Sequence, residues 1–251
     1  MTPGGSGTAP PSGPVRDTTG VAASDAAVKR EPTPVGALFE GAFRRYGGDV
    51  VGYTLWSAGV GVIPLVTTIA LRNWHDVLFA VVASQSLAHF LLCAILTALV
   101  TGTLRTRMLA GAVAATICAA VTTAVFVVGG PLAIILYPLL VFAPIAAAAG
   151  DASALRAVPA GALLAVRDWA RAYAVLLGLG VIAVFLWFAF LLTLLPFGGA
   201  AQQVLTLGLT TLIFSPLAAL VERNFYGDVT GRKVLPASVS IDQRDRGRKR
   251  R

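Results

Sequence analysis

The sequence predicts an all-α protein: a polytopic membrane bundle of six transmembrane helices, with one or two interfacial amphipathic helices and disordered tails. Hydrophobic residues make up 56% of the 251 residues, whereas soluble domains contain about 45–50% apolar residues. Only 13% of the residues are charged. Residues 172–195 contain no charged side chain, and as a helix they reach about 36 Å, enough to cross about 30 Å of hydrocarbon. These observations indicate that most of the chain lies in lipid.

Residues 1–34 are rich in Pro, Gly, Ser, Thr and Ala and form a predicted disordered cytoplasmic tail. Such a segment has too little apolar surface to offset the entropy lost on ordering. Residues 35–48 follow with a different pattern, in which Phe39, Phe43 and Tyr46 recur at i, i+4 and i+7 before Gly47 and Gly48. This spacing predicts a short interfacial amphipathic helix whose aromatic face lodges in the membrane surface.

Residues 49–233 form the predicted membrane domain of six spans. Each apolar run is long enough, or nearly so, for the hydrocarbon core. A charge at the centre of such a helix costs about 2.5–3.5 kcal/mol, and we therefore expect no carboxylate inside the membrane. The predicted spans lie near residues 51–71, 77–100, 108–128, 131–149, 172–195 and 203–221.

The distribution of basic residues predicts the orientation. Of the 20 Lys and Arg residues, only Arg72 falls on one side of the predicted spans. Because Lys and Arg are retained on the cytoplasmic side, we expect a multi-pass protein of the cell (cytoplasmic) membrane, the inner membrane of a bacterium, with both termini cytoplasmic. The basic tail 234–251 should adhere to anionic lipids, at about 1 kcal/mol for each basic residue near the surface. Nucleic acid is not an expected partner, because no aromatic residues alternate with these charges.

The second span carries a polar ridge, made of Gln85, His89, Cys93 and Thr97 at intervals of four residues. In hydrocarbon these groups should face the bundle interior, and we expect interhelical hydrogen bonding to be their role. A proton or substrate path, or a metal held by His89 and Cys93, is the alternative. Two ligands on one helix are too few for a zinc site, and the other histidine, His75, belongs to a predicted external loop.

Motifs for catalysis, cofactor binding or metal binding are not apparent, and we assign no residue to these roles. The sequence has no Gly-x-Ser-x-Gly nucleophile elbow and no phosphate-binding glycine loop after a strand. With no carboxylate expected in the spans, intramembrane acid–base or metal-assisted chemistry has no group to use. We expect Glu222, Asp228 and Arg232 to belong to a solvated helix end with local ion pairs.

Residues 150–171 form the largest internal cytoplasmic loop and contain a second predicted amphipathic helix. Leu163 and Val166 repeat on one face at helical spacing. The charged and aromatic residues after them form either an interfacial anchor or a docking surface for a cytoplasmic protein. These candidate residues are Arg167, Asp168, Trp169 and Arg171.

The chain resembles the glycerophosphoryl diester phosphodiesterase membrane-domain family and related six-span bacterial membrane proteins. The resemblance covers roughly residues 36–233 and rests on the amphipathic lead at residues 38–43, the six spans, the helix before the fifth span, and Tyr226 and Asp228 at the exit from the sixth. In that family the segment after the last span typically reads Tyr-Tyr-Asp-Leu-Arg, whereas in this chain Gly227 lies between Tyr226 and Asp228. The resemblance implies a membrane module that is sometimes joined to a phosphodiesterase barrel. Such a barrel needs about 250 residues, so we expect none in this chain.

The sequence therefore predicts a noncatalytic integral membrane protein, an accessory or lipid-handling module that needs no cofactor. The alternative is a six-span permease subunit that works with a separate ATPase, for which the segment 150–171 would provide the coupling helix. The lipid bilayer, anionic lipids and a protein partner at the cytoplasmic face are the expected contacts.

Overall fold

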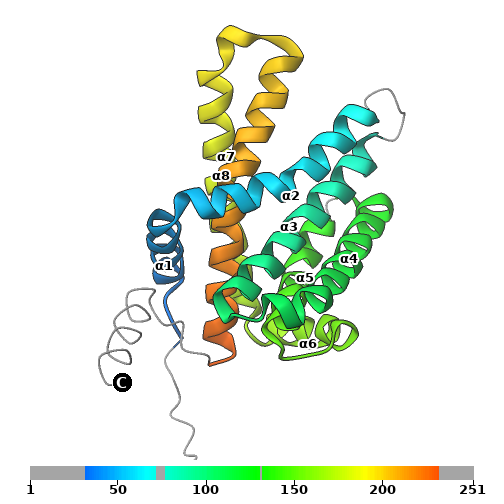
Figure 1. Cartoon of the computed structure of the whole chain (residues 1–251), viewed down its shortest axis with the longest axis vertical. Helices are drawn as coiled ribbons and strands as arrows, with labels where there is room; N and C mark the ends of the chain where they lie inside the picture. Colours follow the sequence, from blue (N-terminus) through cyan, green and yellow to red (C-terminus); the bar gives the residue numbers. More distant parts are fainter. Residues whose placement is uncertain (1–31, 72–76, 131, 232–251) are drawn as a thin grey trace, which may run out of the picture. The chain divides into compact units, whose positions relative to one another are not determined.

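The computed structural model describes residues 32–71, 77–130 and 132–231. Residues 1–31 of the predicted amino-terminal tail, the whole predicted tail 234–251, and Arg72, His75 and Arg232 lie outside the described residues. The described part of the chain is helical throughout, apart from short connections. Figure 1 labels the helices α1 (Val35–Gly48), α2 (Val50–Ala70), α3 (Val77–Thr101), α4 (Leu104–Gly129), α5 (Leu132–Ala149), α6 (Ala154–Arg167), α7 (Trp169–Thr193) and α8 (Gly199–Val229).

The predicted fold class is confirmed, because six of these helices are long and apolar enough to cross a membrane. The chain is therefore a polytopic membrane protein. Five of the six predicted spans agree with the helices to within about one helical turn. The spans are Val50–Ala70, Leu78–Thr101, Leu104–Gly129, Leu132–Ala149, Trp169–Thr193 and Val204–Val229.

Small residues allow α3, α4 and α5 to pack closely together. A Cβ atom built on Gly111 of α4 would lie 2.9 Å from the Cβ of Ala94 and 3.1 Å from the Cβ of Ala148. Helix association in lipid depends on this kind of close approach, because lipid tails are as apolar as the side chains they would replace. The three helices thus pack tightly against one another, and this packing positions α3 and its polar residues.

Helices α7 and α8 form an antiparallel hairpin (Figure 1). A short 3₁₀ helix, Leu195–Phe197, ends α7, and Gly198 and Gly199 then adopt φ values of +58° and +52°. Residues with a Cβ atom rarely adopt these angles, which explains the paired glycines at the turn. The hairpin brings α8 back across the bundle, toward α1, α2 and α3.

The end of α8 differs from the prediction. The sixth span was expected to end near residue 221, but α8 continues to Val229 and carries Glu222 and Asp228 with it. The expectation that no span contains a carboxylate is therefore wrong. Hydropathy alone ends the span at the first charged residue, whereas the folded chain provides partners for these charges.

One of these partners is Arg171, in the first turn of α7. Its guanidinium donates to Asp228 Oδ2 at 2.7 Å and to Asp168 Oδ2 at 2.6 Å. It also donates to the backbone carbonyl of Thr33 at 2.6 Å, and the Thr33 hydroxyl donates to Asp228. This network joins the start of α7, the end of α8 and the segment before α1. Asp228 is thus in an ion pair, as predicted for this helix end, but its partner lies on another helix.

Helix α1 packs by a different face from the one that the aromatic spacing suggested. Leu38 and Ala42 are its buried residues, and the Asn224 side chain of α8 donates to the Leu38 carbonyl at 3.2 Å. Phe39 and Tyr46 pack partly against the core, and Phe43 remains exposed. The aromatic residues therefore do not act as one lipid-facing surface, because the small residue Ala42 lets α1 approach α8 closely.

Helix α6 is amphipathic, as predicted. Ala157, Gly161 and Ala165 are buried, whereas Leu163 and Val166 are exposed. The interhelical contact is very close, since a Cβ atom on Gly161 would lie 2.8 Å from the backbone nitrogen of Ala143 in α5. The exposed apolar face is consistent with an interfacial helix.

Candidate functional site

The polar ridge of α3 is divided between two environments. Gln85 and His89 line a cavity between the helices, together with the neighbouring Ser86. Cys93 and Thr97 lie deeper, and both are fully or almost fully buried. The ridge therefore follows the inner face of the bundle, with His89 at the boundary between the cavity and the core.

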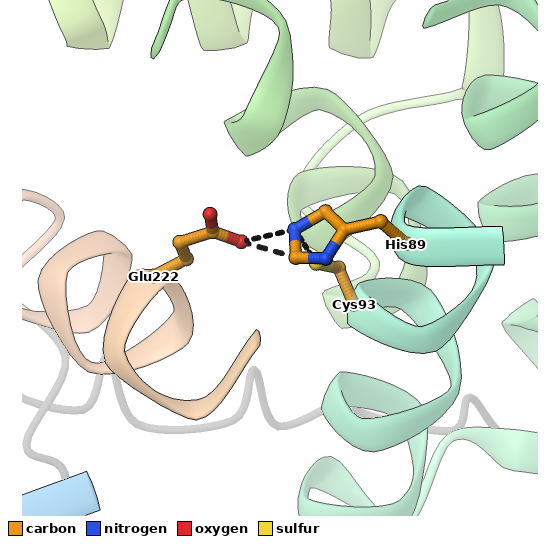
Figure 2. Close-up of side chains that lie close together, drawn as sticks. All are labelled: His89, Cys93 and Glu222. Atoms are coloured by element: carbon orange, nitrogen blue, oxygen red, sulfur yellow. Dashed lines mark hydrogen bonds and ion pairs between the residues drawn. The ribbon is translucent and has the colours of Figure 1, made fainter. Parts of the chain in front are cut away.

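Glu222 of α8 meets the ridge at this boundary (Figure 2). Its Oε2 atom lies 3.0 Å from His89 Nε2 and accepts a hydrogen bond from the Cys93 thiol at 3.2 Å. The Cys93 sulfur is 3.5 Å from the same histidine nitrogen. Because His89 and Cys93 are one helical turn apart, both side chains point to one place on α8. We call these three residues the His–Cys–Glu cluster.

Tyr137 of α5 holds the second carboxylate oxygen. Its hydroxyl donates to Glu222 Oε1 at 2.8 Å. The Tyr137 ring stacks on the Phe90 ring, with 5.7 Å between the two ring centroids. The centroid of the His89 ring lies 5.8 Å from that of Tyr137. Both oxygens of Glu222 are thus engaged by groups from α3 and α5. Glu222 itself is only 3% exposed, so these contacts offset the cost of taking a carboxylate out of water.

The cavity that His89 and Glu222 line has a volume of about 460 Å³. Side chains of α3, α4, α5, α7 and α8 line it, and its walls are mainly apolar, with Phe126, Ile134 and Leu179 among them. Its polar residues are Gln85, Ser86, His89, Thr122, Tyr137, Thr210, Thr211, Ser215 and Glu222. The space has the size and composition of a small-molecule site, for which about 300–1,000 Å³ is usual.

Sequence reasoning missed Glu222 and Tyr137. Glu222 was expected to belong to a solvated helix end, and this expectation is wrong, because the residue is buried among α3, α5 and α8. A signal was present: the residues on both sides of it, from Leu217 to Val221 and at Phe225, are apolar and continue the helix. The argument against acid–base chemistry that relied on a lack of carboxylates also fails at this residue.

The four candidate docking residues, at the end of α6 and the start of α7, fall into two groups. Asp168 and Arg171 are engaged within the chain, in the network with Asp228. Arg167 and Trp169 are exposed, Trp169 by 64%. Of these four residues, only Arg167 and Trp169 are free to contact another protein or the membrane surface without the loss of an ion pair shown in the structure. Their role stays a prediction.

The His–Cys–Glu cluster offers three kinds of ligand atom within 4.8 Å of one another: an imidazole nitrogen, a thiol sulfur and a carboxylate oxygen. It also offers a carboxylate that accepts hydrogen bonds at both oxygens. The described residues thus place metal-ligating and proton-binding groups beside a mainly apolar cavity. This combination is the most informative site in the described part of the chain.

No family model, curated protein or solved structure matches the chain. The resemblance to the glycerophosphoryl diester phosphodiesterase membrane-domain family thus stays a prediction from the sequence. The two exit residues that carry it both make contacts in the fold: Tyr226 donates to Asp151 Oδ2 at 2.6 Å, and Asp228 pairs with Arg171. Function has to be argued from the site itself.

Proposed function

We propose that this protein is a noncatalytic, lipid-handling membrane module that binds an amphiphilic molecule in the cavity between α3, α4 and α5 on one side and α7 and α8 on the other. The observation that carries the proposal is the cavity, an open cleft of about 460 Å³ with mainly apolar walls, whose polar groups include His89 and Glu222. An apolar body would lie against the walls, and a small polar end would meet these residues. Ligand sites in proteins combine these two features.

Binding rather than turnover is supported by the state of Glu222. Its Oε1 accepts from Tyr137, and its Oε2 contacts both His89 and Cys93. A carboxylate with both oxygens held in this way is well placed to fix the shape of a site. A general base, by contrast, needs an oxygen within hydrogen-bond reach of the proton that it removes from a substrate.

The test is a pair of tryptophan substitutions at glycines with open space around them. Gly180 lines the cavity and Gly59 lies on α2, and a Cβ atom on either would meet nothing within 4 Å. We expect the Gly180→Trp protein to lose, by at least about tenfold, a lipid species that copurifies with the wild-type protein, because the indole fills the cavity. Gly59→Trp should retain that species, as measured by mass spectrometry of extracted lipids.

Equal retention by the two variants would contradict the proposal. So would a wild-type protein whose bound lipids only mirror the composition of the membrane. Both variants must elute as monodisperse particles in size-exclusion chromatography, so that a loss of lipid reports on the cavity and not on unfolding.

We further propose that the protein lies in the cell membrane with both termini cytoplasmic. The distribution of basic residues supports this: Arg105, Arg107 and Arg156 lie at the ends of helices on the side of α6, whereas residues 194–203 of the α7–α8 turn contain no Lys or Arg. Short loops that carry Lys and Arg remain in the cytoplasm.

Cysteine labelling of intact cells checks this orientation. Phe197 in the α7–α8 turn and Thr106 near the start of α4 are both exposed, and the native Cys93 and Cys118 are buried. We expect a membrane-impermeant maleimide to label Phe197→Cys in intact cells, and to label Thr106→Cys only after permeabilisation. The reverse pattern would place the termini outside.

The alternative, a permease subunit with a separate ATPase, is favoured by the exposed apolar face of α6. Leu155 and Leu163 are 74% and 70% exposed on this helix. Recovery of an ATPase in stoichiometric amount after crosslinking would support this second function, whereas a lipid-facing α6 would crosslink mainly to lipid.

A further inference from the structure

We infer that His89, Cys93 and Glu222 form an intramembrane binding site for a divalent transition-metal ion, with Zn²⁺ the best match to the three donor atoms. Zn²⁺ is bound in proteins by imidazole nitrogen, thiolate sulfur and carboxylate oxygen, which are the three atoms of the cluster. Mg²⁺ and Ca²⁺ take oxygen ligands, and Cu(I) favours sulfur. The inference does not depend on the proposed lipid ligand, because it rests on the cluster alone.

The spacing of the donor atoms fits a bound ion. Nε2 of His89, Sγ of Cys93 and Oε2 of Glu222 form a triangle with sides of 3.0, 3.2 and 3.5 Å. The circle through these three points has a radius of about 1.9 Å, and bonds to zinc are about 2.0–2.3 Å long. An ion would therefore sit about 1 Å above the plane of the three atoms, as in a tetrahedral site with one further position. Its binding requires shifts of only a few tenths of an ångström.

Charge balance also favours the ion. A carboxylate within a span is costly, and such residues are paired in membrane proteins. When a divalent ion binds, the S–H bond of Cys93 breaks, a metal–sulfur bond forms, and the thiol proton is released to water. A divalent cation, one thiolate, one carboxylate and a neutral imidazole then sum to no net charge. The loaded cluster thus places no net charge inside the span.

A neighbouring residue orients the carboxylate ligand through a hydrogen bond, as is usual at metal sites. Tyr137 donates to Oε1 of Glu222, which leaves Oε2 directed at His89 and Cys93. Figure 2 shows the carboxylate of α8 facing the two side chains of α3. His89 and Glu222 also line the cavity, which leaves room for a fourth ligand. Three protein ligands and one further position are the arrangement of zinc sites that bind another molecule.

The test uses the full-length protein, purified in detergent and freed of metal with a chelator. We expect it to bind about one Co²⁺ ion per chain, with a thiolate-to-cobalt charge-transfer band in the near ultraviolet, because the cluster contributes a single thiolate. Zn²⁺ should displace the cobalt and remove the band. Cys93→Ser should abolish the band and weaken Zn²⁺ binding by about 100-fold or more, beyond the 10–100-fold loss usual when a residue that only hydrogen-bonds to a ligand is replaced.

Cys118→Ser is the matched control. Cys118 is also a buried free cysteine, but its Sγ contacts the carbonyl of Leu140 and not the cluster. This variant should keep the band and the affinity of the wild-type protein. Tyr137→Phe should keep the band and bind Zn²⁺ about tenfold less tightly, because Tyr137 is a positioning residue and not a ligand.

A folded wild-type protein that shows no cobalt band and retains no stoichiometric Zn²⁺ would overturn the inference, as would a band that persists in Cys93→Ser. X-ray absorption of the Zn²⁺-loaded wild-type protein needs no variant, and it should show one sulfur neighbour at about 2.3 Å with nitrogen and oxygen neighbours at about 2.0–2.2 Å. A spectrum without sulfur contradicts the inference. Lipid retention by the Gly180 and Gly59 variants is measured separately, so the two proposals can fail independently.

Discussion

Glu222→Ala is expected to lower the free energy of unfolding by about 3–5 kcal/mol, because three polar groups lose the hydrogen-bond partner that they share. Three protein groups contact the carboxylate: the hydroxyl of Tyr137 at 2.8 Å, Nε2 of His89 at 3.0 Å and the thiol of Cys93 at 3.2 Å. Alanine leaves these groups without the carboxylate, and the fully buried Cys93 cannot replace this partner with water. Each unsatisfied buried group costs about 1–3 kcal/mol.

The measurement is the thermal unfolding midpoint of the purified protein in detergent, without added metal, followed by tryptophan fluorescence. A loss of this size should lower the midpoint by on the order of 10 °C. Glu40→Ala is the control, because the Glu40–Arg44 ion pair of α1 is exposed, with 68% and 75% of the two side chains accessible. Exposed pairs contribute at most about 1 kcal/mol. Equal midpoints for the two variants would show that Glu222 is not held as the structure indicates.

Gly161→Ala is expected to destabilise the protein by about 1–3 kcal/mol, the usual cost of overpacking a close contact. The new Cβ atom would lie 2.8 Å from the backbone nitrogen of Ala143 and 3.1 Å from the carbonyl carbon of Phe142. Both are backbone atoms of α5, so no side chain can rotate to relieve the clash. Helix α6 must move away from α5, and the buried Ala157 and Ala165 then lose their contacts.

Gly59→Ala should change stability in the opposite direction. A Cβ atom on Gly59, in the interior of α2, meets nothing within 4 Å, and alanine in a helix is favoured over glycine by about 0.5–1 kcal/mol. The two substitutions are chemically identical, so a comparison of their unfolding midpoints isolates the close packing of α6 on α5. If both variants were stabilised, the contact at Gly161 would be looser than the structure shows.

The close packing of α6 also bears on the permease alternative. A coupling helix must move relative to its own membrane domain when a motor acts on it. The backbone contact at Gly161 holds the middle of α6 against α5. Arg171, in the first turn of α7, forms an ion pair with Asp228 of α8 and so fixes the chain directly after α6. Both contacts favour a static connector, which agrees better with a lipid-binding module than with a motor-driven subunit.

The metal inference and the lipid-binding proposal concern adjoining parts of one site. The His–Cys–Glu cluster lies where the cavity meets the core, and His89 and Glu222 belong to both. A bound ion would present its open position to the polar end of an amphiphilic ligand. If both tests succeed, lipid retention should be measured again after chelation, which shows directly whether the ion takes part in ligand binding.

The amino-acid sequence is sufficient to predict the all-α class, the six apolar helices, the two amphipathic helices and the alignment of Gln85, His89, Cys93 and Thr97 on α3. These are local properties: hydropathy over about 20 residues and side chains that recur at helical spacing can be evaluated within one segment. Helix α6 illustrates this, since its amphipathic character and the common face of Leu163 and Val166 follow from its own spacing.

The residues that form the site are brought together by the packing of helices that are distant in the sequence. Glu222 lies 133 positions from His89 and 85 from Tyr137 in the sequence, and it ends an apolar run, so hydropathy places it outside the membrane. Whether a charged residue can remain inside a span depends on the groups that other helices bring to it. For the same reason α1 buries Leu38 and Ala42 instead of a purely aromatic face, because the surface it contacts is made by α8, far away in the chain.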